Sequence, residues 1–407
     1  MAAAGGRTFR HRNDVNILLL APHPFFQVRG TPLAVRTVFE FLSARGHHVD
    51  LLTYHEGEDI DLPNCRIFRI ARLPGLSNIR PGFSLKKLVC DGLMIVECIR
   101  LLRRTRYDLI HAVEEAAFIA AAIQAVTRIP YVYDMDSSLV EQLVDAYPRL
   151  QLVGGALRRC EGFVIRRSLG VLTVCAALAK IVHGYAPRKL VGRVEDTSLL
   201  PLIEQPATGD GGMPPDIPAR GPVAMYVGNL EPYQGIDLLL DGFRYVLESV
   251  PEAQLVIVGG GSDDVRRYRE IAAAAGHDAQ VHFLGPRPIS HLPALFKQAN
   301  VLVSPRLKGI NTPMKIYSYL DSRTAVLATK LPTHTQVLDP QIAYLVEPEA
   351  EALGRGLVQL FREPELRERL ASEAKRYVQQ EFSPEAARRK LGNFYTLIES
   401  QTADLRA

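Results

Sequence analysis

The chain has 407 residues, of which 47% are hydrophobic and 23% charged, and its formal net charge is +4. These proportions are ordinary for a globular protein, and the length predicts two or three domains, each with its own core. No stretch approaches the roughly 18 apolar residues that a membrane-spanning helix needs.

The five cysteines are odd in number and include no C-x-x-C pair. This pattern argues against a disulfide framework or a zinc site and predicts reduced thiols in the cytoplasm. Near the amino terminus, the apolar run NILLLA follows several basic residues. It is too short for a signal peptide and lacks a small-residue cleavage site, so it predicts the first core strand instead.

Strand and helix signals alternate through the first half. Short apolar runs predict strands, and longer runs with a 3.6-residue period predict helices. The alternation predicts a mostly parallel sheet with helices on both faces. The expected strands are 15–20, 49–53, 109–112, 131–134 and 171–175, and the expected helices are 33–44, 85–105, 118–126 and 157–168.

A segment rich in Pro and Gly, from Ile203 to Pro222, is the clearest predicted linker. Beyond it the alternation restarts, and the end of the chain from Glu351 to Ile398 is predicted to be largely helical. The sequence therefore predicts two doubly wound α/β domains in tandem, with a cleft between their facing loops. The expected strands of the second domain are 223–227, 254–258, 280–284, 300–303, 325–328 and 342–346.

The stretch from Val223 to Asp264 carries the clearest functional signal. Its pattern is a strand, a Gly-rich loop, an amphipathic helix, a second strand and a second Gly-rich turn. Turns of this kind place backbone N–H groups and helix N-termini at the carboxyl ends of parallel strands, where ligand phosphates bind in open α/β sheets. The segment predicts a nucleotide-type ligand in the second half of the chain.

The order of motifs resembles that of the retaining family 4 glycosyltransferases, which have the GT-B fold. In the second half, the pieces that carry the resemblance are YVGNLEPYQGIDLLLDGF, LVIVGGGSDD, VHFLGPRPISHLPALFKQANVLVSPR and TPMKIYSYLDSRTAVLAT. In the first half they are FFQVRGTPLAVRTVFEFLSARGHHVDLLT and YDLIHAVEE. The closing EFSPEAARRKLGNFYTLIE is similar to the family's last helix.

The resemblance implies two Rossmann-like domains with a cleft between them and a C-terminal helix that crosses back. Residues 1–203 would bind the acceptor, residues 204–385 would bind the nucleotide sugar, and residues 386–407 would form the returning helix. The implied reaction moves a hexosyl group from a nucleoside diphosphate sugar to a hydroxyl of a glycolipid or polysaccharide, with retained anomeric configuration. No cofactor or metal is implied, because helix N-termini and cations can stabilise the leaving diphosphate.

The sequence departs from the family pattern where the donor should bind. The family usually grips the diphosphate with an Arg and a Lys, and this chain has Asn229 and Gln234 at those positions. The two glutamates of the E-x7-E motif would fall at Ile310 and Ser318, so both carboxylates are replaced. The His that usually follows the D-x-x-H histidine by two residues is Val113.

Two interpretations of these departures remain open. In the first, the cations have moved to positions around the GINTP loop, where Arg and Lys suit a diphosphate. In the second, the donor site has decayed, and the chain is a catalytically silent GT-B protein that binds a glycan, a nucleotide or a protein partner. A nucleotide-sugar 2-epimerase, which shares the architecture, is a third alternative. On the first interpretation the donor-binding residues are Gly228, Asn229, Gln234, Gly235, Gly260, Arg306, Lys308, Lys315 and Ser318, with Ser318 on a ribose hydroxyl.

In the first half, the candidate residues lie near the ends of predicted strands. His111 and Glu114 are expected to bond acceptor or donor hydroxyls, with Glu114 as a candidate base, and Asp136 is expected to orient the acceptor. The alternatives are a buried core histidine for His111 and a helix N-cap for Asp136. Gly30 and Thr31 are expected to form a turn before a helix, either as part of the phosphate or acceptor pocket or as a plain tight turn.

The predicted helix 85–105 is basic at both ends and carries many apolar residues. It predicts either a helix apposed to a membrane or a core-packed helix with a solvated basic rim. The expected partners are the nucleotide-sugar donor, a glycan or lipid-linked acceptor and, if this helix is apposed to a membrane, the inner face of that membrane. No nucleic-acid partner is expected.

Overall fold

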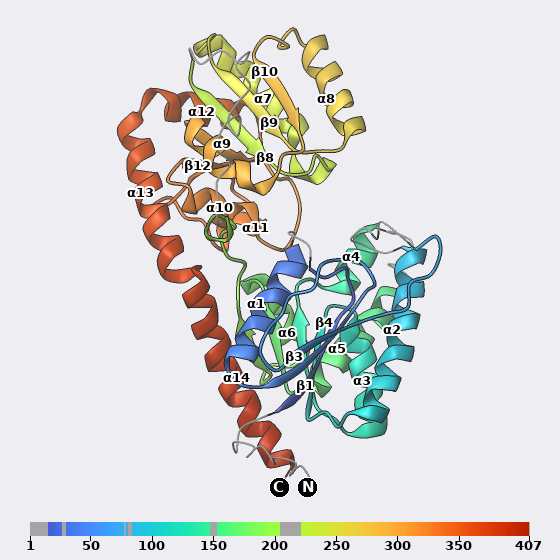
Figure 1. Cartoon of the computed structure of the whole chain (residues 1–407). Coiled ribbons are helices and arrows are strands. Elements are labelled where there is room, and N and C mark those ends of the chain that lie inside the picture. The colour runs from blue at the N-terminus through green and yellow to red at the C-terminus, as the bar shows by residue number, and fades with distance from the viewer. Residues whose placement is uncertain are drawn as a thin grey trace, which may run out of the picture. The chain divides into compact units, whose positions relative to one another are not determined.

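The computed structural model describes residues 15–26, 30–76, 79, 84–146, 153–203 and 221–406. The chain forms two compact units (Figure 1). Unit 1 comprises Met1–Glu195 and Arg388–Ala407, and unit 2 comprises Asp196–Ala387. Most of the linker predicted at 203–222 lies outside the described residues.

Unit 1 is built on a seven-stranded parallel sheet with the order β3-β2-β1-β4-β5-β6-β7. The order reverses between β1 and β4, which are neighbours in register from Ile17 and Leu109 onward. Every residue of β1 after the first is buried, as expected for a parallel strand that is covered on both faces. The strands are β1 (Asn16–Ala21), β2 (His48–Thr53), β3 (Cys65–Arg69), β4 (Leu109–Val113), β5 (Tyr131–Met135), β6 (Gly170–Thr173) and β7 (Leu190–Arg193).

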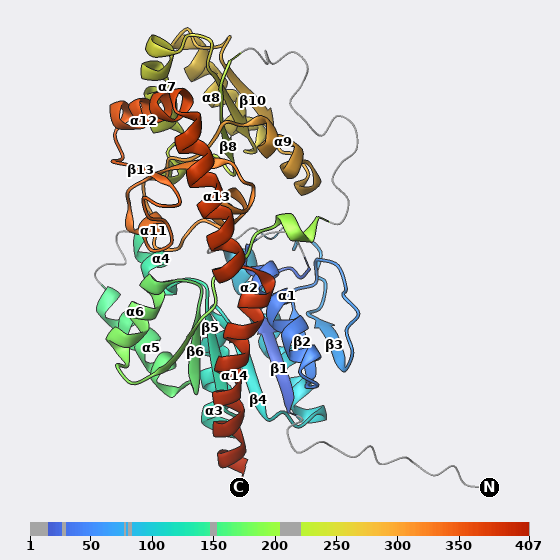
Figure 2. The ribbon, with the colours of Figure 1, turned by 90° about the vertical axis from the view of Figure 1, so that its left-hand side faces the viewer.

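The helices of unit 1 come from both ends of its sequence. The last helix of the chain, α14, returns to unit 1 and shares a hydrophobic core with α1 and one face of the sheet, through Leu391, Phe394 and Ile398 (Figure 2). The helices are α1 (Gly30–Ala44), α2 (Leu85–Arg104), α3 (Ala116–Thr127), α4 (Leu139–Ala146), α5 (Gly154–Arg167), α6 (Ala176–Tyr185) and α14 (Pro384–Arg406).

Unit 2 contains a six-stranded parallel sheet with the order β10-β9-β8-β11-β12-β13. Its order reverses between β8 and β11, so the loops that follow these two strands emerge side by side. The strands are β8 (Val223–Val227), β9 (Gln254–Val258), β10 (Val281–Gly285), β11 (Val301–Ser304), β12 (Ala325–Thr329) and β13 (Tyr344–Val346).

Two hydrophobic clusters fill the two faces of this second sheet. Alternate residues of β8 separate between them, with Ala224 and Tyr226 in one cluster and Val223 and Met225 in the other. The helical segments of unit 2 are η2 (Leu200–Leu202), η3 (Pro232–Gln234), α7 (Ile236–Ser249), α8 (Ser262–Ala274), η4 (Ile289–His291), α9 (Leu292–Gln298), α10 (Lys315–Asp321), α11 (Pro332–Thr335), α12 (Ala350–Arg362) and α13 (Pro364–Glu381).

Two local predictions differ from the structure. Gly30 and Thr31 do not form a turn before α1 but are its first two residues. The interpretation of 85–105 as a helix whose apolar face packs in the core is wrong for most of that face, because Leu85, Leu88 and Val96 are exposed. No helix in the described part of the chain is long and apolar enough to span a bilayer.

Candidate functional site

In unit 2, the two glycine-rich turns after β8 and β9 touch each other. A Cβ atom placed on Gly259 would lie 2.1 Å from the carbonyl oxygen of Gly228, so only glycine fits there. Gly228, Gly259 and Gly260 all have positive φ angles, of 154°, 109° and 80°. Because these residues are glycines, no side chain covers the backbone at the carboxyl ends of β8 and β9. A ligand phosphate can therefore approach the backbone closely, as in phosphate-binding turns.

Gly235 brings a third loop to the same place. Its φ is 76°, and a Cβ atom there would lie 2.0 Å from the carbonyl oxygen of Pro305, which follows β11. The loop after β8 thus packs directly on the loop after β11. This contact places the residues that follow Pro305 beside the glycine turns.

Two cations, Arg306 and Lys315, lie in this cluster. The Lys315 ammonium contacts Gln234 Oε1 at 3.1 Å and lies 3.8 Å from the ring centre of Tyr226. The Arg306 guanidinium donates to the carbonyls of Lys308 and Asn311 and lies 5.2 Å from the ring centre of Tyr233. Within the described residues, neither cation forms an ion pair with a carboxylate.

The electrostatics of these two cations are unfavourable without a ligand. Burial lowers the pKa of Lys315 well below its ordinary value, and the positive charge of Arg306 lowers it further. Burial also lowers the pKa of Arg306. Partly desolvated cations without a counter-ion are stabilised by any anion that can reach them. The arrangement can therefore hold the charge of a diphosphate.

The other donor-side candidates lie around this pair in different ways. Gln234 is buried and accepts a hydrogen bond from Lys315. Asn229 and Lys308 are exposed, and their backbone carbonyls accept hydrogen bonds from Tyr226 and Arg306. Ser318 lies one turn after Lys315 on α10 and is buried, and its hydroxyl accepts a hydrogen bond of 3.0 Å from the Leu199 N–H. The prediction that Ser318 binds a ribose hydroxyl stays a prediction.

His334, which the sequence did not indicate as a site residue, lies beneath the same loop. Its ring nitrogens contact Ser304 Oγ at 2.9 Å and the Thr329 carbonyl at 2.8 Å. Burial lowers the pKa of His334 to about 4, and the charges of Arg306 and Lys315 lower it as well. The sequence around it, PTHTQ, does not indicate a site residue, because the side chains and backbone that surround His334 come from the strands β11 and β12.

In unit 1, carboxylates gather where β4 and β5 end. Glu114 follows β4 with a φ of 51°, and the Ser137 hydroxyl lies 3.0 Å from both of its carboxylate oxygens. Burial and the negative charge of Glu115 raise the pKa of Glu114 to about 7. Glu115 forms a 2.6 Å ion pair with Lys87. A carboxyl group with such a pKa can accept or donate a hydrogen bond near neutral pH, as a sugar hydroxyl requires.

His111 is fully buried, and both of its ring nitrogens have partners inside unit 1. Nε2 lies 3.0 Å from Asp134 Oδ2, and Nδ1 lies 2.6 Å from the hydroxyl of Tyr395 on α14. The main chain of Asp134 in turn accepts a hydrogen bond from the Glu114 N–H at 2.8 Å. His111 thus ties the returning helix to the ends of β4 and β5, a link that no local sequence pattern indicates.

The remaining first-half candidates lie at the end of β5 and at the start of α1. Asp136 is buried one residue past the end of β5, in the same group of strand ends as Glu114. Gly30 is exposed at the start of α1, and a Cβ atom there would meet nothing within 4 Å. Thr31 follows it in the first turn of the helix.

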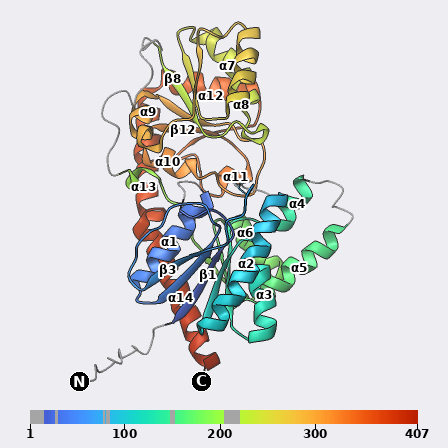
Figure 3. The ribbon, with the colours of Figure 1, turned by 45° about the vertical axis from the view of Figure 1, so that its right-hand side comes forward.

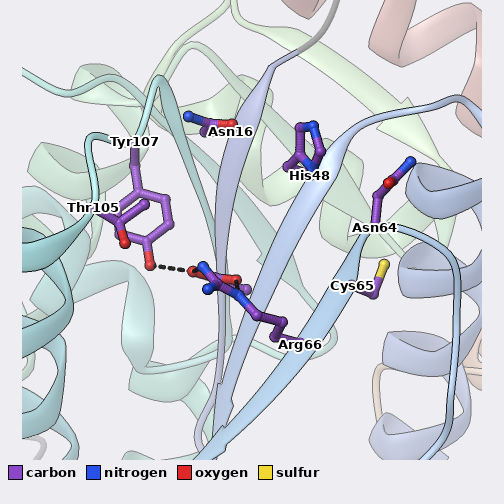
Figure 4. Close-up of a pocket in the computed structure, with 8 residues that line it drawn as sticks. Asn16, His48, Asn64, Cys65, Arg66, Thr105 and Tyr107 are labelled. Atoms are coloured by element: carbon purple, nitrogen blue, oxygen red, sulfur yellow. Dashed lines mark hydrogen bonds and ion pairs between the residues drawn. The ribbon is translucent and has the colours of Figure 1, made fainter. Parts of the chain in front are cut away.

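A separate cavity of about 460 Å³ lies near the opposite, amino ends of β1, β2 and β3 (Figure 4). One of its lining carboxylates, Asp50, accepts hydrogen bonds of 2.8 Å from Nε and Nη2 of Arg66 and one of 2.5 Å from the Tyr107 hydroxyl. The carboxylate is therefore already satisfied within the protein. No cluster of three or more potential metal ligands occurs among the described residues.

Comparison with known families covers both units. The family "Glycosyl transferases group 1" matches residues 214–377, and "Glycosyl transferase 4-like domain" matches residues 29–191. The chain belongs to the family 4-type glycosyltransferases of the GT-B fold. The resemblance inferred from the motif order is confirmed, and so is the two-domain α/β architecture.

Curated relatives of this glycosyltransferase match it over part of their length. The phosphatidyl-myo-inositol mannosyltransferase of Mycobacterium tuberculosis is 27% identical over 222 residues, which are 49% of this chain and 56% of the relative. The D-inositol 3-phosphate glycosyltransferase of Corynebacterium efficiens is 26% identical over 283 residues, covering 65% of this chain and 66% of the relative. The chain spans about half the length of the mycobacterial relatives that it matches.

Solved structures share the fold over nearly the whole chain. A sucrose-phosphate synthase from Thermosynechococcus elongatus superposes with a TM-score of 0.76 at 20% identity, covering 95% of this chain and all of that one. Anabaena Alr3699/HepE, solved in complex with UDP, superposes with a TM-score of 0.69 at 16% identity, over 94% of this chain and 99% of the other.

Proposed function

We propose that this family 4-type protein transfers a sugar from a nucleoside diphosphate sugar to a hydroxyl of a glycolipid or polysaccharide, with retention of configuration and without a metal. The observation that carries the proposal is the pair Arg306 and Lys315, which lies at the glycine turns without a carboxylate partner among the described residues. Family membership and the diphosphate complexes of structural neighbours support it.

In this proposal the two cations bind the diphosphate and stabilise the charge that develops on it. The bond between the anomeric carbon and the phosphate oxygen breaks, while a bond from the acceptor oxygen forms on the same face of the sugar. The acceptor proton passes to the departing phosphate, so no nucleophilic carboxylate is required. Cations that are already fixed in a partly buried site stabilise such charge more strongly than they would in water.

The residues at the strand ends of unit 1 would hold the acceptor. Glu114 and Asp136 would accept hydrogen bonds from acceptor hydroxyls, and Gly30 and Thr31 would line the same region. Because both nitrogens of His111 are bonded inside the protein, we assign it a positioning role through Asp134. The names of the curated relatives, which specify inositol-containing compounds, support a polyol hydroxyl as the acceptor class.

The test begins with thermal unfolding of the protein in EDTA with UDP, GDP, TDP, ADP, CMP and their common sugar conjugates. A ligand at about 100 times its dissociation constant stabilises by about 2.7 kcal/mol, which is a readily measured shift. The nucleotide that stabilises is then used as the labelled donor with lipid and glycan acceptors. Sugar transfer in EDTA with retained configuration is the expected result, and inversion or a strict metal requirement would contradict the proposal.

The second candidate function is a silent GT-B protein that binds without transferring. It is favoured by the replacement of four family positions, with Asn229, Gln234, Ile310 and Ser318 in place of two cations and two carboxylates. Stabilisation by a nucleotide without donor hydrolysis or transfer to any acceptor class would support this candidate and overturn the transferase proposal.

A further inference from the structure

The helix α2 of unit 1 has two apolar sides, of which only one is covered. Its buried side consists of Cys90, Met94, Cys98 and Leu101, which are at most 3% exposed. Figure 3 shows α2 on the outside of unit 1. Its outward side carries six large aliphatic residues. They are Leu85 (78% exposed), Leu88 (47%), Val89 (41%), Ile95 (43%), Val96 (47%) and Ile99 (43%).

These six residues form one continuous stripe, which we call the α2 stripe. At about 100° per residue, Leu85, Val96 and Ile99 project from one side of the helix, and Met94 projects from the other. The helix therefore carries a second apolar side in addition to its buried one, whereas an ordinary surface helix turns a polar side to water. Scattered exposed apolar residues are common, but a contiguous row along one helix indicates a surface that meets another apolar phase.

The charges that accompany the stripe are positive. Arg100, Arg103 and Arg104 are exposed in the last turns of α2, and Arg106 is exposed just after it. Arg100 pairs with Glu97 at 2.9 Å, whereas Arg103 and Arg104 form no ion pair within the described residues. An aliphatic stripe with arginines at its border matches a bilayer surface, where apolar side chains enter the acyl boundary and cations meet anionic headgroups.

We propose that the α2 stripe docks on the surface of a membrane that contains anionic lipids. Docking uses only side chains that the fold leaves exposed, and it needs no spanning helix. The stripe would lie in the interface with its arginines at headgroup level, where their aliphatic stems can extend along the apolar surface.

The inner side of α2 connects this surface to the candidate acceptor site. Lys87 forms its ion pair with Glu115, next to Glu114, and Asp91 accepts a 2.5 Å hydrogen bond from the Tyr54 hydroxyl. A docked α2 would therefore hold the loop after β4 close to the lipid surface. This connection rests on the proposed function, because it presumes a lipid-linked acceptor, whereas docking itself does not.

The test is flotation of the full chain with vesicles, without donor or acceptor. One set of vesicles is phosphatidylcholine alone, and the other contains about one third phosphatidylglycerol. We expect binding to the anionic vesicles that weakens as salt is raised, because salt screens the arginines. The triple variant Leu88→Gln, Val96→Gln, Ile99→Gln is expected to bind at least about tenfold more weakly. The double variant Arg103→Gln, Arg104→Gln should lose most of the preference for anionic vesicles.

The matched control places glutamine at exposed aliphatic positions outside the stripe. Ile271→Gln with Leu397→Gln changes side chains that are 39% and 51% exposed on α8 and α14, and it should bind like the wild type. Circular dichroism melting confirms that all variants fold.

Absence of wild-type binding, or equal binding by the triple variant, would overturn the proposal. The proposal would also be overturned if light scattering showed a homodimer, and if the triple variant abolished this dimer but left vesicle binding unchanged. Transfer to a water-soluble acceptor is measured separately, so failure of docking leaves the proposed reaction intact.

Discussion

The strand ends of the two sheets carry opposite charge. In unit 2 the buried groups are cations, and burial lowers the pKa of Lys315, whereas in unit 1 they are carboxylates, and burial raises the pKa of Glu114. Burial therefore pushes both groups toward their neutral forms. The ligand that would stabilise each charged form differs. An anion would stabilise the charged form of Lys315 in unit 2, and hydroxyl groups that donate hydrogen bonds would stabilise the charged form of Glu114 in unit 1. Under the proposed function, the carboxyl ends of the two sheets would therefore bind ligands of different chemistry.

The backbone at the two edges differs as well. In unit 2, Gly228, Gly259 and Gly260 bring bare backbone to the carboxyl ends of the strands, and a Cβ atom on Gly259 would clash with the main chain. Unit 1 has a comparable glycine after β2, Gly57, where a Cβ atom would lie 2.1 Å from the Phe25 carbonyl oxygen, whereas its candidate site glycine, Gly30, meets open space. A ligand in unit 2 is therefore expected to contact the main chain, and a ligand in unit 1 is expected to contact side chains. The predictions that follow test this contrast.

The largest effect is expected for Gly259→Ala, compared with Gly30→Ala. The new methyl group in unit 2 would clash with the Gly228 carbonyl at a positive φ, so we expect a loss of about 3 kcal/mol or more in the free energy of unfolding. Gly30→Ala, at the start of a helix with free space, should change stability by less than about 1 kcal/mol. Urea unfolding measures both, and equal effects would contradict the contrast.

The next effect is the pH dependence of stability at Glu114. Its pKa is about 7 in the folded chain and close to 4.5 when unfolded, so the folded state binds the proton more tightly. The stabilisation is complete below about pH 4.5 and is lost as the pH rises through 7. Glu114→Gln has no carboxyl group and should not lose stability in this way. The difference in the free energy of unfolding between the variant and the wild type should therefore shift in favour of the variant by about 1–3 kcal/mol between pH 5 and pH 8.

His334 in unit 2 should show the opposite sign. Its folded pKa of about 4 lies below its ordinary value of 6.5, so stability is present above 6.5 and is lost as the pH falls through 4. His334→Gln should flatten that part of the pH profile, which melting curves between pH 4 and 7 will show. If both variants shifted the profile in the same direction, the electrostatic contrast between the units would be wrong.

A smaller effect is expected for Tyr395→Phe. Removing the hydroxyl leaves Nδ1 of the buried His111 without its 2.6 Å partner, which should cost about 1–2 kcal/mol. The matched control is Tyr344→Phe in unit 2, where the hydroxyl contacts Gln359 at the surface and little change is expected. A loss confined to Tyr395→Phe in urea unfolding supports the link between α14 and the β4 end, and equal losses would argue against it.

Periodicity and motif order predicted the two-domain α/β architecture because buried strands and amphipathic helices show in short sequence windows. The strands β3 and β7 and the helices α4 and α6 were not predicted. The apolar run of β1 and the stripe of α7 report burial directly, and the glycines after β8 and β9 mark positive φ. The 3.6-residue period of α2 also gave a real apolar face. It could not show which side of that helix the sheet would cover, because the side facing the sheet depends on residues far away in the chain.

The site was harder to predict because its members meet only through tertiary contacts. Lys315 and Arg306 were expected to replace the family's cations, but the buried environment that lowers their pKa depends on how Gly235 packs against Pro305. One of the two partners of His111, Tyr395, lies 284 residues further along the chain, on α14. No spacing rule covers such a distance. Roles in donor and acceptor binding stay predictions for the candidate residues.

The most direct test of the account is calorimetric titration of wild type and Lys315→Met, in EDTA, with the nucleoside diphosphate that stabilises the protein and with the corresponding nucleoside. We predict that Lys315→Met weakens diphosphate binding by about tenfold to a hundredfold, as expected for a lost charge-assisted contact. Nucleoside binding and the ligand-free melting temperature should not fall. Lys297→Met, at an exposed lysine of unit 2, should bind like the wild type. Unchanged diphosphate binding in Lys315→Met would contradict the central claim that this buried cation holds the donor.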